Sequence, residues 1–585
     1  MKRIHTEDDE DDPSRDSAAS LDTSGVSSTQ ALPAKKKPRS KQKDSSHEFS
    51  SREIARLRHM GAVDHSSLFR LQVTELLKEV SVKGKLRQRL SAAVDALTKL
   101  LLALPAGTEH ELSDRSWLQT LGVRLPLVET PAGGKGRFRF EPPSKVTAEG
   151  SFVLDTIVKP RTEVDLALHI PKSVFQPKDH LNQRCVRKQA LYLAHVAAAL
   201  RGHKDVQGLG FQYHRGNPLK PTLVVSVKGK DCKTVSVRVH ARLDPDTFKL
   251  SRFDVNKNNI RPRWYLGQGQ REEEDGAEAT SLPPTPVYNM SVLHDLCAAR
   301  HLECMRQSVG VSEGLRQGVM LLTVWLRQRQ AHEGWGSFPE DLLCSVVALL
   351  VGRGQLNTSM TGYQVFRAVL QYLSQADWQT DPPSLCAEVE PSRLVAFTSR
   401  FPVVFVDGSG WLNLAYTLTA AALLKVRQEA KLTISALGKS EGQKFQVVFL
   451  THKSFPRSFD YLCHVTIDAR SLRRSGERVD NLATAAMDVG GQMSLALTSH
   501  LEQLLTSALD DRVTLVCAAP RPNPQWSVND APLDYDEQSY LTFGLCLNTS
   551  AAFSVLNKGP PADHPEALAF REMWGDKSEM RRFKD

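Results

Sequence analysis

The sequence lacks the features that mark secreted, disulfide-rich or membrane-spanning proteins. Its nine cysteines include no CxxC pair, so we expect reduced thiols in the cytosol or nucleus, and neither a disulfide scaffold nor a zinc ribbon. The longest apolar runs fall short of the roughly 18–20 residues that cross a bilayer. The acidic block Glu7–Asp12 stands where a signal peptide would have its apolar core. The sequence therefore predicts neither secretion nor membrane association.

What is present is an ordinary apolar content with an excess of basic residues. Of 585 residues, 41% are hydrophobic and 24% are charged, with 75 Lys and Arg against 66 Asp and Glu. At about 150 residues per domain, this length predicts three or four folded units. The net charge of +9 and the pI near 9.0 favour a polyanionic partner such as a nucleic acid.

Residues 1–60 are expected to form a disordered tail, because an acidic run, a Ser/Thr-rich spacer and a basic run leave few apolar residues to bury. The basic run suits the acidic grooves of nuclear-import receptors or a phosphate backbone. A merely solvated charge run remains the alternative. The residues predicted to direct nuclear localisation are Lys35, Lys36, Lys37, Arg39, Lys41 and Lys43.

The rest of the chain divides by its apolar patterns, and the fold class predicted is α+β, multidomain. The expected segments are a helical hairpin at 61–108, a mixed α/β domain at 109–266, an acidic Pro-rich linker at 267–287, a helical domain at 288–438 and a second α/β domain at 439–585.

Within these segments, some runs are assigned to particular elements. Val164–Ile170 alternates as a strand does, and 221–243 reads as two strands joined by a polar turn, a β-hairpin. Leu118–Val128 and Phe152–Val158 are also predicted as strands, and a helix is predicted from Leu412 to Gln428.

The most informative motif is Gly150-Ser151 followed by Glu163 and Asp165. Residues two apart on a strand face the same side, so Glu163 and Asp165 would present two carboxylates together. The Gly-Ser turn offers backbone amides and a hydroxyl to phosphate groups, because glycine lets the backbone approach closely. This pattern is typical of a site for a nucleotide and a divalent metal ion.

The arrangement resembles the signature of the DNA polymerase β-like nucleotidyltransferases, which include poly(A) polymerases and oligoadenylate synthetases. The resemblance implies a third carboxylate on a later strand, which completes a site for two metal ions. On the second strand of the predicted hairpin, that face carries Ser236, Arg238 and His240 instead. Asp244 or Asp246 would have to replace the missing ligand from a turn that contains a proline. We therefore expect a degenerate site with at most two of the three carboxylates.

Two further segments narrow the resemblance to the Nrap family. The 319–329 helix looks like a substrate-binding helix of poly(A) polymerases and oligoadenylate synthetases, with Thr323 where a lysine is frequent, followed by Trp325 and Arg329. A core position explains Trp325 equally well. The C-terminal run Phe570–Asp585 matches the family's box FR-x-x-WG-x-K-x-E-x-RRF-x-D.

Membership of that family implies a domain plan. The 109–266 domain would be nucleotidyltransferase-like, the 288–438 domain would be like the helical domain of poly(A) polymerases and oligoadenylate synthetases, and 439–585 would begin a second nucleotidyltransferase-like domain. Because family members are longer, we expect the last domain to be truncated.

The resemblance also implies a function: a non-catalytic RNA-binding scaffold, located in the nucleus and nucleolus. It would belong to the UTP-C module of the small-subunit processome and act in pre-rRNA processing and small ribosomal subunit biogenesis. The implied partners are pre-rRNA or small nucleolar RNA and other processome proteins, including a ribosomal-RNA-processing partner within that module. No enzymatic activity, cofactor or bound metal is expected.

Two alternatives remain open. One is an active RNA nucleotidyltransferase that uses Glu163 and Asp165 with metal. The other is a protein-interaction module whose basic tail only directs nuclear import. Further predicted sites are possible RNA contacts at Arg261, Arg263, Trp264, Arg581 and Arg582, and possible phosphorylation at Thr6 and Thr285.

Overall fold

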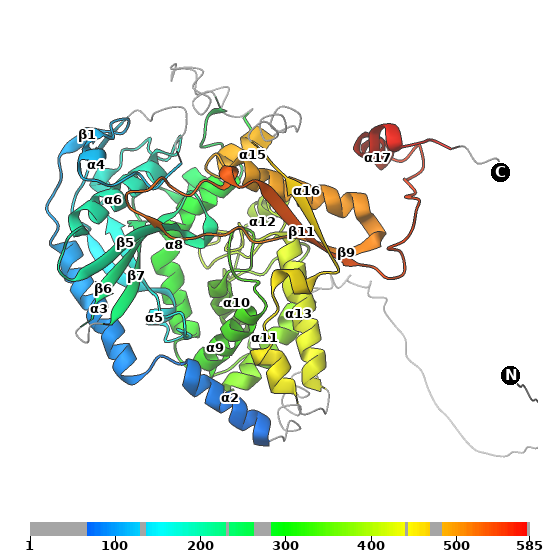
Figure 1. Ribbon diagram of the computed structural model, residues 1–585, viewed down its shortest axis with the longest axis horizontal. Coiled ribbons are helices and arrows are strands. Elements are labelled where there is room, and N and C mark those ends of the chain that lie inside the picture. Colours follow the sequence, from blue (N-terminus) through cyan, green and yellow to red (C-terminus); the bar gives the residue numbers. More distant parts are fainter. Residues whose placement is uncertain are drawn as a thin grey trace, which may run out of the picture. The chain divides into compact units, whose positions relative to one another are not determined.

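The computed structural model describes residues 67–128, 136–229, 233–262, 282–438, 443–468 and 482–581 (Figure 1). We call 109–262 the sheet domain, 282–438 the helical domain and 443–581 the C-terminal domain. The mixture of helices with a mixed sheet confirms the predicted α+β class. None of the described helices combines the length and apolar content needed to cross a bilayer.

A mixed six-stranded sheet organises the sheet domain, in the order β10-β5-β6-β7-β4-β3. β4 and β7 run parallel, and β6 and β7 form the predicted antiparallel hairpin. Alternation sets the faces of β4: Val164, Leu166 and Leu168 are fully buried, while Asp165 lies on the other side. The strands are β3 (Lys145–Glu149), β4 (Val164–Ile170), β5 (Val206–Tyr213), β6 (Pro221–Lys228), β7 (Thr234–Leu243) and β10 (Trp526–Ser527).

Two long helices come before this sheet in the sequence, and a third lies between strands β4 and β5. α3 (Gly84–Leu102) and α6 (Arg184–Leu200) pack on its strands, while α2 (Ser67–Val80) packs on α9 (Glu313–Gln328) of the helical domain. One continuous apolar core joins residues from Phe69 to Val528, so the sheet and helical domains share their interior.

Two strand predictions in the sheet domain are wrong. The 118–128 run begins inside helix α4 (Ser116–Thr120), which starts where the Asp114 carboxylate accepts hydrogen bonds from the backbone and hydroxyl of Ser116. The 152–158 run begins inside α5 (Gly150–Val153), where Gly150 has a φ of +63°. Apolar runs this short do not distinguish a strand from a helical turn. The short strands here are instead β1 (Glu109–Glu111) and β2 (Arg137–Arg139).

The helical domain consists of six principal helices among its described residues: α8 (Pro286–Ser308), α9 (Glu313–Gln328), α10 (Glu340–Gly352), α11 (Gly362–Gln375), α12 (Pro391–Arg400) and α13 (Ala420–Gly438). The helix predicted from Leu412 begins only at Ala420. The Asn413 side chain holds the preceding segment out of helical form by bonding to the backbone of Phe405 and Val403. Trp325 is fully buried and donates its indole N–H to Thr433 Oγ1 at 2.9 Å, so it is a core residue.

The C-terminal domain carries a three-stranded antiparallel sheet in the order β8-β11-β9. Figure 1 shows β9 beside α13, and the two elements are in contact. A π-helical turn, Gln446–Leu450, precedes the sheet. The remaining elements are β8 (Tyr461–Thr466), α15 (Leu482–Asp488), α16 (Met493–Leu509), β9 (Val513–Ala518), β11 (Tyr540–Leu547) and α17 (Glu566–Trp574).

Asp488 joins the C-terminal domain to the first turn of α8. Its carboxylate accepts the backbone N–H groups of Val287 at 2.9 Å and Tyr288 at 2.8 Å, two donors that a helix start leaves without partners. Complete burial raises the pKa of Asp488 to about 7, against the lowering effect of these two hydrogen bonds. The contact is therefore sensitive to pH.

We predict that Asp488→Asn flattens the dependence of stability on pH between about 4 and about 7. Over that range the folded protein keeps the proton that the unfolded chain releases near pH 4, so stability falls as pH rises. Melting temperatures from about pH 5 to about pH 8 would be compared for the wild type, Asp488→Asn and the exposed control Asp530→Asn. A constant difference between wild type and Asp488→Asn across this range would contradict the prediction.

Candidate functional site

The predicted motif residues come together at the end of β3 and the start of β4. Glu149, the last residue of β3, pairs in register with Asp165 on β4, and Glu163 immediately precedes β4. Gly150 turns the chain above Asp165 so closely that a Cβ there would lie 3.3 Å from Asp165 Oδ2. Gly150, Ser151, Glu163 and Asp165 all line one cleft of about 820 Å³.

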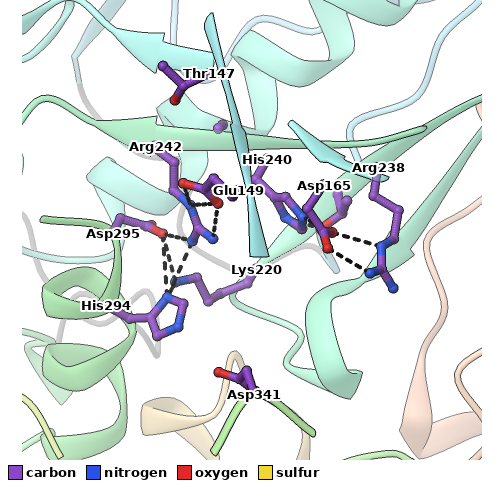
Figure 2. A network of polar contacts seen from close by, with 12 residues as sticks. Thr147, Glu149, Asp165, Lys220, Arg238, His240, Arg242, His294, Asp295 and Asp341 are labelled. Carbon is purple, nitrogen blue, oxygen red and sulfur yellow. Dashed lines mark hydrogen bonds and ion pairs between the residues drawn. The ribbon is translucent and has the colours of Figure 1, made fainter. Parts of the chain in front are cut away.

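Asp165 is bound on both oxygens by residues of β7. Arg238, its in-register neighbour on the parallel strand, donates Nε to Oδ1 and Nη2 to Oδ2, each at 2.8 Å (Figure 2). His240 Nε2 donates to Oδ1, also at 2.8 Å, while its Nδ1 faces the Thr222 hydroxyl. Burial acts to raise the pKa of Asp165, but the charge of Arg238 and the bonds from His240 and Arg238 hold it well below its ordinary value.

Glu163 shares the same cation. Arg238 Nη1 lies 3.3 Å from Glu163 Oε2, at a more exposed part of the cleft. The two carboxylates predicted to be metal ligands are therefore both paired with an arginine that occupies one of the positions predicted for the third ligand. Ser236, the position before it on this face, does not line the cleft.

A second arginine of β7 ties the sheet to the helical domain. Arg242 Nη2 lies 2.9 Å from Glu149 Oε2, and its Nη1 lies 2.6 Å from Asp295 Oδ1 on α8 (Figure 2). Lys220 also reaches Asp295 Oδ1, at 2.8 Å, and its Nζ donates to His294 Nδ1 at 3.0 Å. Burial lowers the pKa of His294 well below its usual range, so this imidazole is a neutral acceptor.

Sequence reasoning missed this second cluster of Glu149, Lys220, Arg242, His294 and Asp295. Arg238, His240 and Arg242 alternate along β7, so a same-face argument extended by two residues would have included Arg242. Asp295 and Lys220 carry no such signal, because only the packing of α8 against the sheet brings them together.

The two acids considered as replacements lie elsewhere. Asp244 accepts hydrogen bonds from the Ser144 hydroxyl at 3.1 Å, and neither it nor Asp246 is among the described residues that line the cleft. In the described part of the chain, no group of three or more His, Cys, Asp or Glu side chains is arranged to hold a metal ion.

The other predicted sites are scattered. Arg261 donates Nη1 to the backbone and side-chain oxygens of Asn258, and Arg581 is exposed beside Glu579. Thr285 is buried, with its Oγ1 accepting the Asn259 N–H, so a kinase could reach it only after local opening. Outside the described residues lie Thr6, Arg263, Trp264, Arg582 and the localisation residues Lys35, Lys36, Lys37, Arg39, Lys41 and Lys43.

Three parts of the chain form the walls of the cleft. The sheet domain supplies the charged face of β4 and β7, and the helical domain supplies residues of α8, α9 and α10, including Thr323. The segment Ala519–Asn523 of the C-terminal domain closes a third side. A mixed sheet and a helical domain therefore face each other across a cleft whose sheet side carries carboxylates.

Comparison with models of protein families identifies the family to which the chain belongs. The chain matches Nrap protein domain 1 over residues 108–309, the Nrap protein PAP/OAS-like domain over 314–452 and Nrap protein domain 3 over 455–585. The chain belongs to the Nrap family.

Curated relatives share the name nucleolar protein 6. The human protein is 40% identical over 540 residues, the Xenopus laevis protein 36% over 535 and the Drosophila melanogaster protein 30% over 544. These alignments cover 92%, 91% and 91% of this chain but only 46%, 46% and 43% of the relatives, so the chain spans a little under half of their length. Their shared name places the family, and this chain with it, in the nucleolus.

Solved structures show only distant likeness. CdnC from E. coli MS115-1 with ATP matches with a TM-score of 0.38 and 13% identity, covering 66% of this chain and 98% of that one. The Cid1 poly(U) polymerase matches with a TM-score of 0.35 and 10% identity, covering 66% and 99%.

We predict that Arg238→Asp makes the stability of the protein depend on divalent metal. The change removes the cation shared by Glu163 and Asp165 and adds a third carboxylate, so the variant should lose about 3–5 kcal/mol without metal. Magnesium should restore part of the lost melting temperature of the variant, because the ion would compensate the negative charge of the three carboxylates. The wild type and the exposed control Arg457→Asp should not respond. A wild-type melting temperature that rises with magnesium as much as the variant's would contradict the assignment.

Proposed function

We propose that this chain is a non-catalytic RNA-binding scaffold that acts in small ribosomal subunit biogenesis. The observation that carries the proposal is the pairing of Asp165 with Arg238 and His240, which engages both carboxylate oxygens. A fixed guanidinium stands at a position where two-metal catalysis would need a carboxylate.

Metal-dependent transfer would have to break these contacts first. In two-metal catalysis, two ions about 3.5–4 Å apart bridge carboxylates, the attacking oxygen and the leaving oxygen. Magnesium demands oxygen ligands at about 2.0–2.1 Å, and an arginine beside the same oxygens repels it. Displacing Arg238 would break its bidentate pair with Asp165 and its pair with Glu163, and would leave these carboxylates without their cation.

The RNA-binding part of the proposal rests on the net charge of the chain and on its similarity to nucleolar proteins. A net charge of +9 favours a polyanionic ligand, and the relatives are nucleolar proteins. More finely, we propose that the chain works in pre-rRNA processing within the UTP-C module of the small-subunit processome. Pre-rRNA or small nucleolar RNA and a ribosomal-RNA-processing protein of that module would be its partners.

We predict that the purified protein adds no nucleotide to RNA. It would be incubated with single-stranded RNA, labelled nucleoside triphosphates, and magnesium or manganese, beside an active poly(A) polymerase as the positive control. The wild type and Asp165→Ala should give the same background incorporation. Extension by the wild type that Asp165→Ala abolishes would establish the alternative, an active nucleotidyltransferase that uses Glu163 and Asp165.

RNA affinity should fall steeply as salt is raised, because phosphate contacts release counterions. Filter binding or fluorescence anisotropy across a salt series measures the slope. An affinity that hardly changes with salt would instead favour a protein-interaction module.

A further inference from the structure

The arginines that line the cleft differ in whether they have a counterion. Five of the six described ones pair with carboxylates: Arg161 with Glu333, Arg215 with Asp341, Arg238 with Asp165, Arg242 with Glu149, and Arg327 with Glu340. Arg521, from the C-terminal domain, forms no ion pair with any described residue. Among the described arginines of the cleft, Arg521 is therefore the one without an ion-pair partner.

Arg521 is only 7% exposed. Its Nη1 donates to the neutral amide oxygen of Gln538, while Nε and Nη2 have no hydrogen-bond partner among the described residues. The neighbouring acid, Asp536, is committed to the start of α16, where it accepts the N–H groups of Met493 and Ser494. A desolvated guanidinium with two unused donors is stabilised by an anion.

The backbone around Arg521 is held from two sides. A Cβ on Gly334 of the helical domain would lie 2.8 Å from the backbone oxygen of Arg521, so the backbones of these two segments are in direct contact. Two residues further on, Asn523 accepts from Gln212 and donates to the Tyr213 carbonyl, both on β5. β10 then pairs with β5. The guanidinium is thus presented by a fixed segment, which lowers the entropic cost of binding a ligand.

The sheet side of the cleft, which carries Glu163 and Asp165, disfavours an anion. Glu163 and Asp165 share one cation, Arg238, and His240, which donates to Asp165 alone, is a neutral imidazole because burial lowers its pKa. His214 and His301, which also line the cleft, likewise have pKa values lowered by burial. These two imidazoles add uncharged aromatic surface to the lining of the cleft, and such a surface suits bases.

We infer that Arg521 binds a phosphate group of single-stranded RNA within this cleft, without a metal ion. The inference rests on the proposed function, since it names the place where RNA meets the protein. The cleft, at about 820 Å³, is large enough for a nucleotide-sized group. The phosphate would lie at the wall that the segment Ala519–Asn523 of the C-terminal domain forms.

The test measures binding of a fluorescent oligouridylate of about eight nucleotides to the full chain in EDTA, over a salt series. We predict that Arg521→Gln weakens binding about five- to tenfold and lowers the salt slope by about 0.7, the value for one lost phosphate contact on a single strand. Arg521→Lys should keep the slope because it keeps the charge. The matched control is the variant Arg457→Gln, which changes an exposed arginine of the same domain.

Because Arg521 is buried, a second measurement uses the wild-type protein alone. Photocrosslinking with 4-thiouridine in the same oligonucleotide should give adducts in the peptide that contains residues 519–523. Binding that Arg521→Gln leaves unchanged, with all crosslinks elsewhere, would overturn this inference while leaving RNA binding intact. Failure of the wild type to bind at any salt concentration would overturn the proposed function too. Displacement of the strand by uridine monophosphate at equal concentration would assign the site to free nucleotides instead of RNA.

Discussion

The pair between Arg238 and Asp165 is the electrostatic constraint that the rest of the site depends on. β4 and β7 lie side by side, so Asp165 and Glu163 stand together on a partly buried face where their charge must be compensated. In a two-metal enzyme, metal ions supply that charge. Here an arginine fixed in the neighbouring strand supplies it permanently. This one arginine therefore compensates the charge that metal ions supply in such enzymes, and it carries the proposed loss of catalysis.

Arg242 compensates carboxylate charge in the same way at the interface between the sheet domain and the helical domain. Arg242 compensates Glu149 within the sheet and Asp295 on α8, with Lys220 as a second cation beside Asp295. Buried ion pairs contribute little net stability compared with apolar packing, but leaving one member without its partner is costly. The cluster therefore specifies how α8 sits on the sheet. Another placement of α8 would take Asp295 away from Arg242 and Lys220, the two cations that compensate it.

Local alternation explains why the centre of the site could be predicted from the sequence and its surroundings could not. Period-two patterns located β4 and β7, and with them Asp165, Arg238 and His240 on one face of these neighbouring strands. The method failed at 118–128 and 152–158, where a capping carboxylate and a glycine with positive φ convert short apolar runs into helical turns. Asp295 and Arg521 had no local signal, since tertiary packing alone brings them to the cleft.

The cleft is a property of the three domains together. Gly216 in the sheet domain approaches so closely that a Cβ there would lie 2.8 Å from the Trp335 nitrogen and 3.2 Å from the Tyr535 hydroxyl, which belong to the other two domains. Gly334 makes the corresponding approach to Arg521. Both glycines have positive φ, so a side chain at either would be strained as well as crowded. Because these contacts set the third wall, the position of the unpaired arginine depends on the C-terminal domain being folded against the other two.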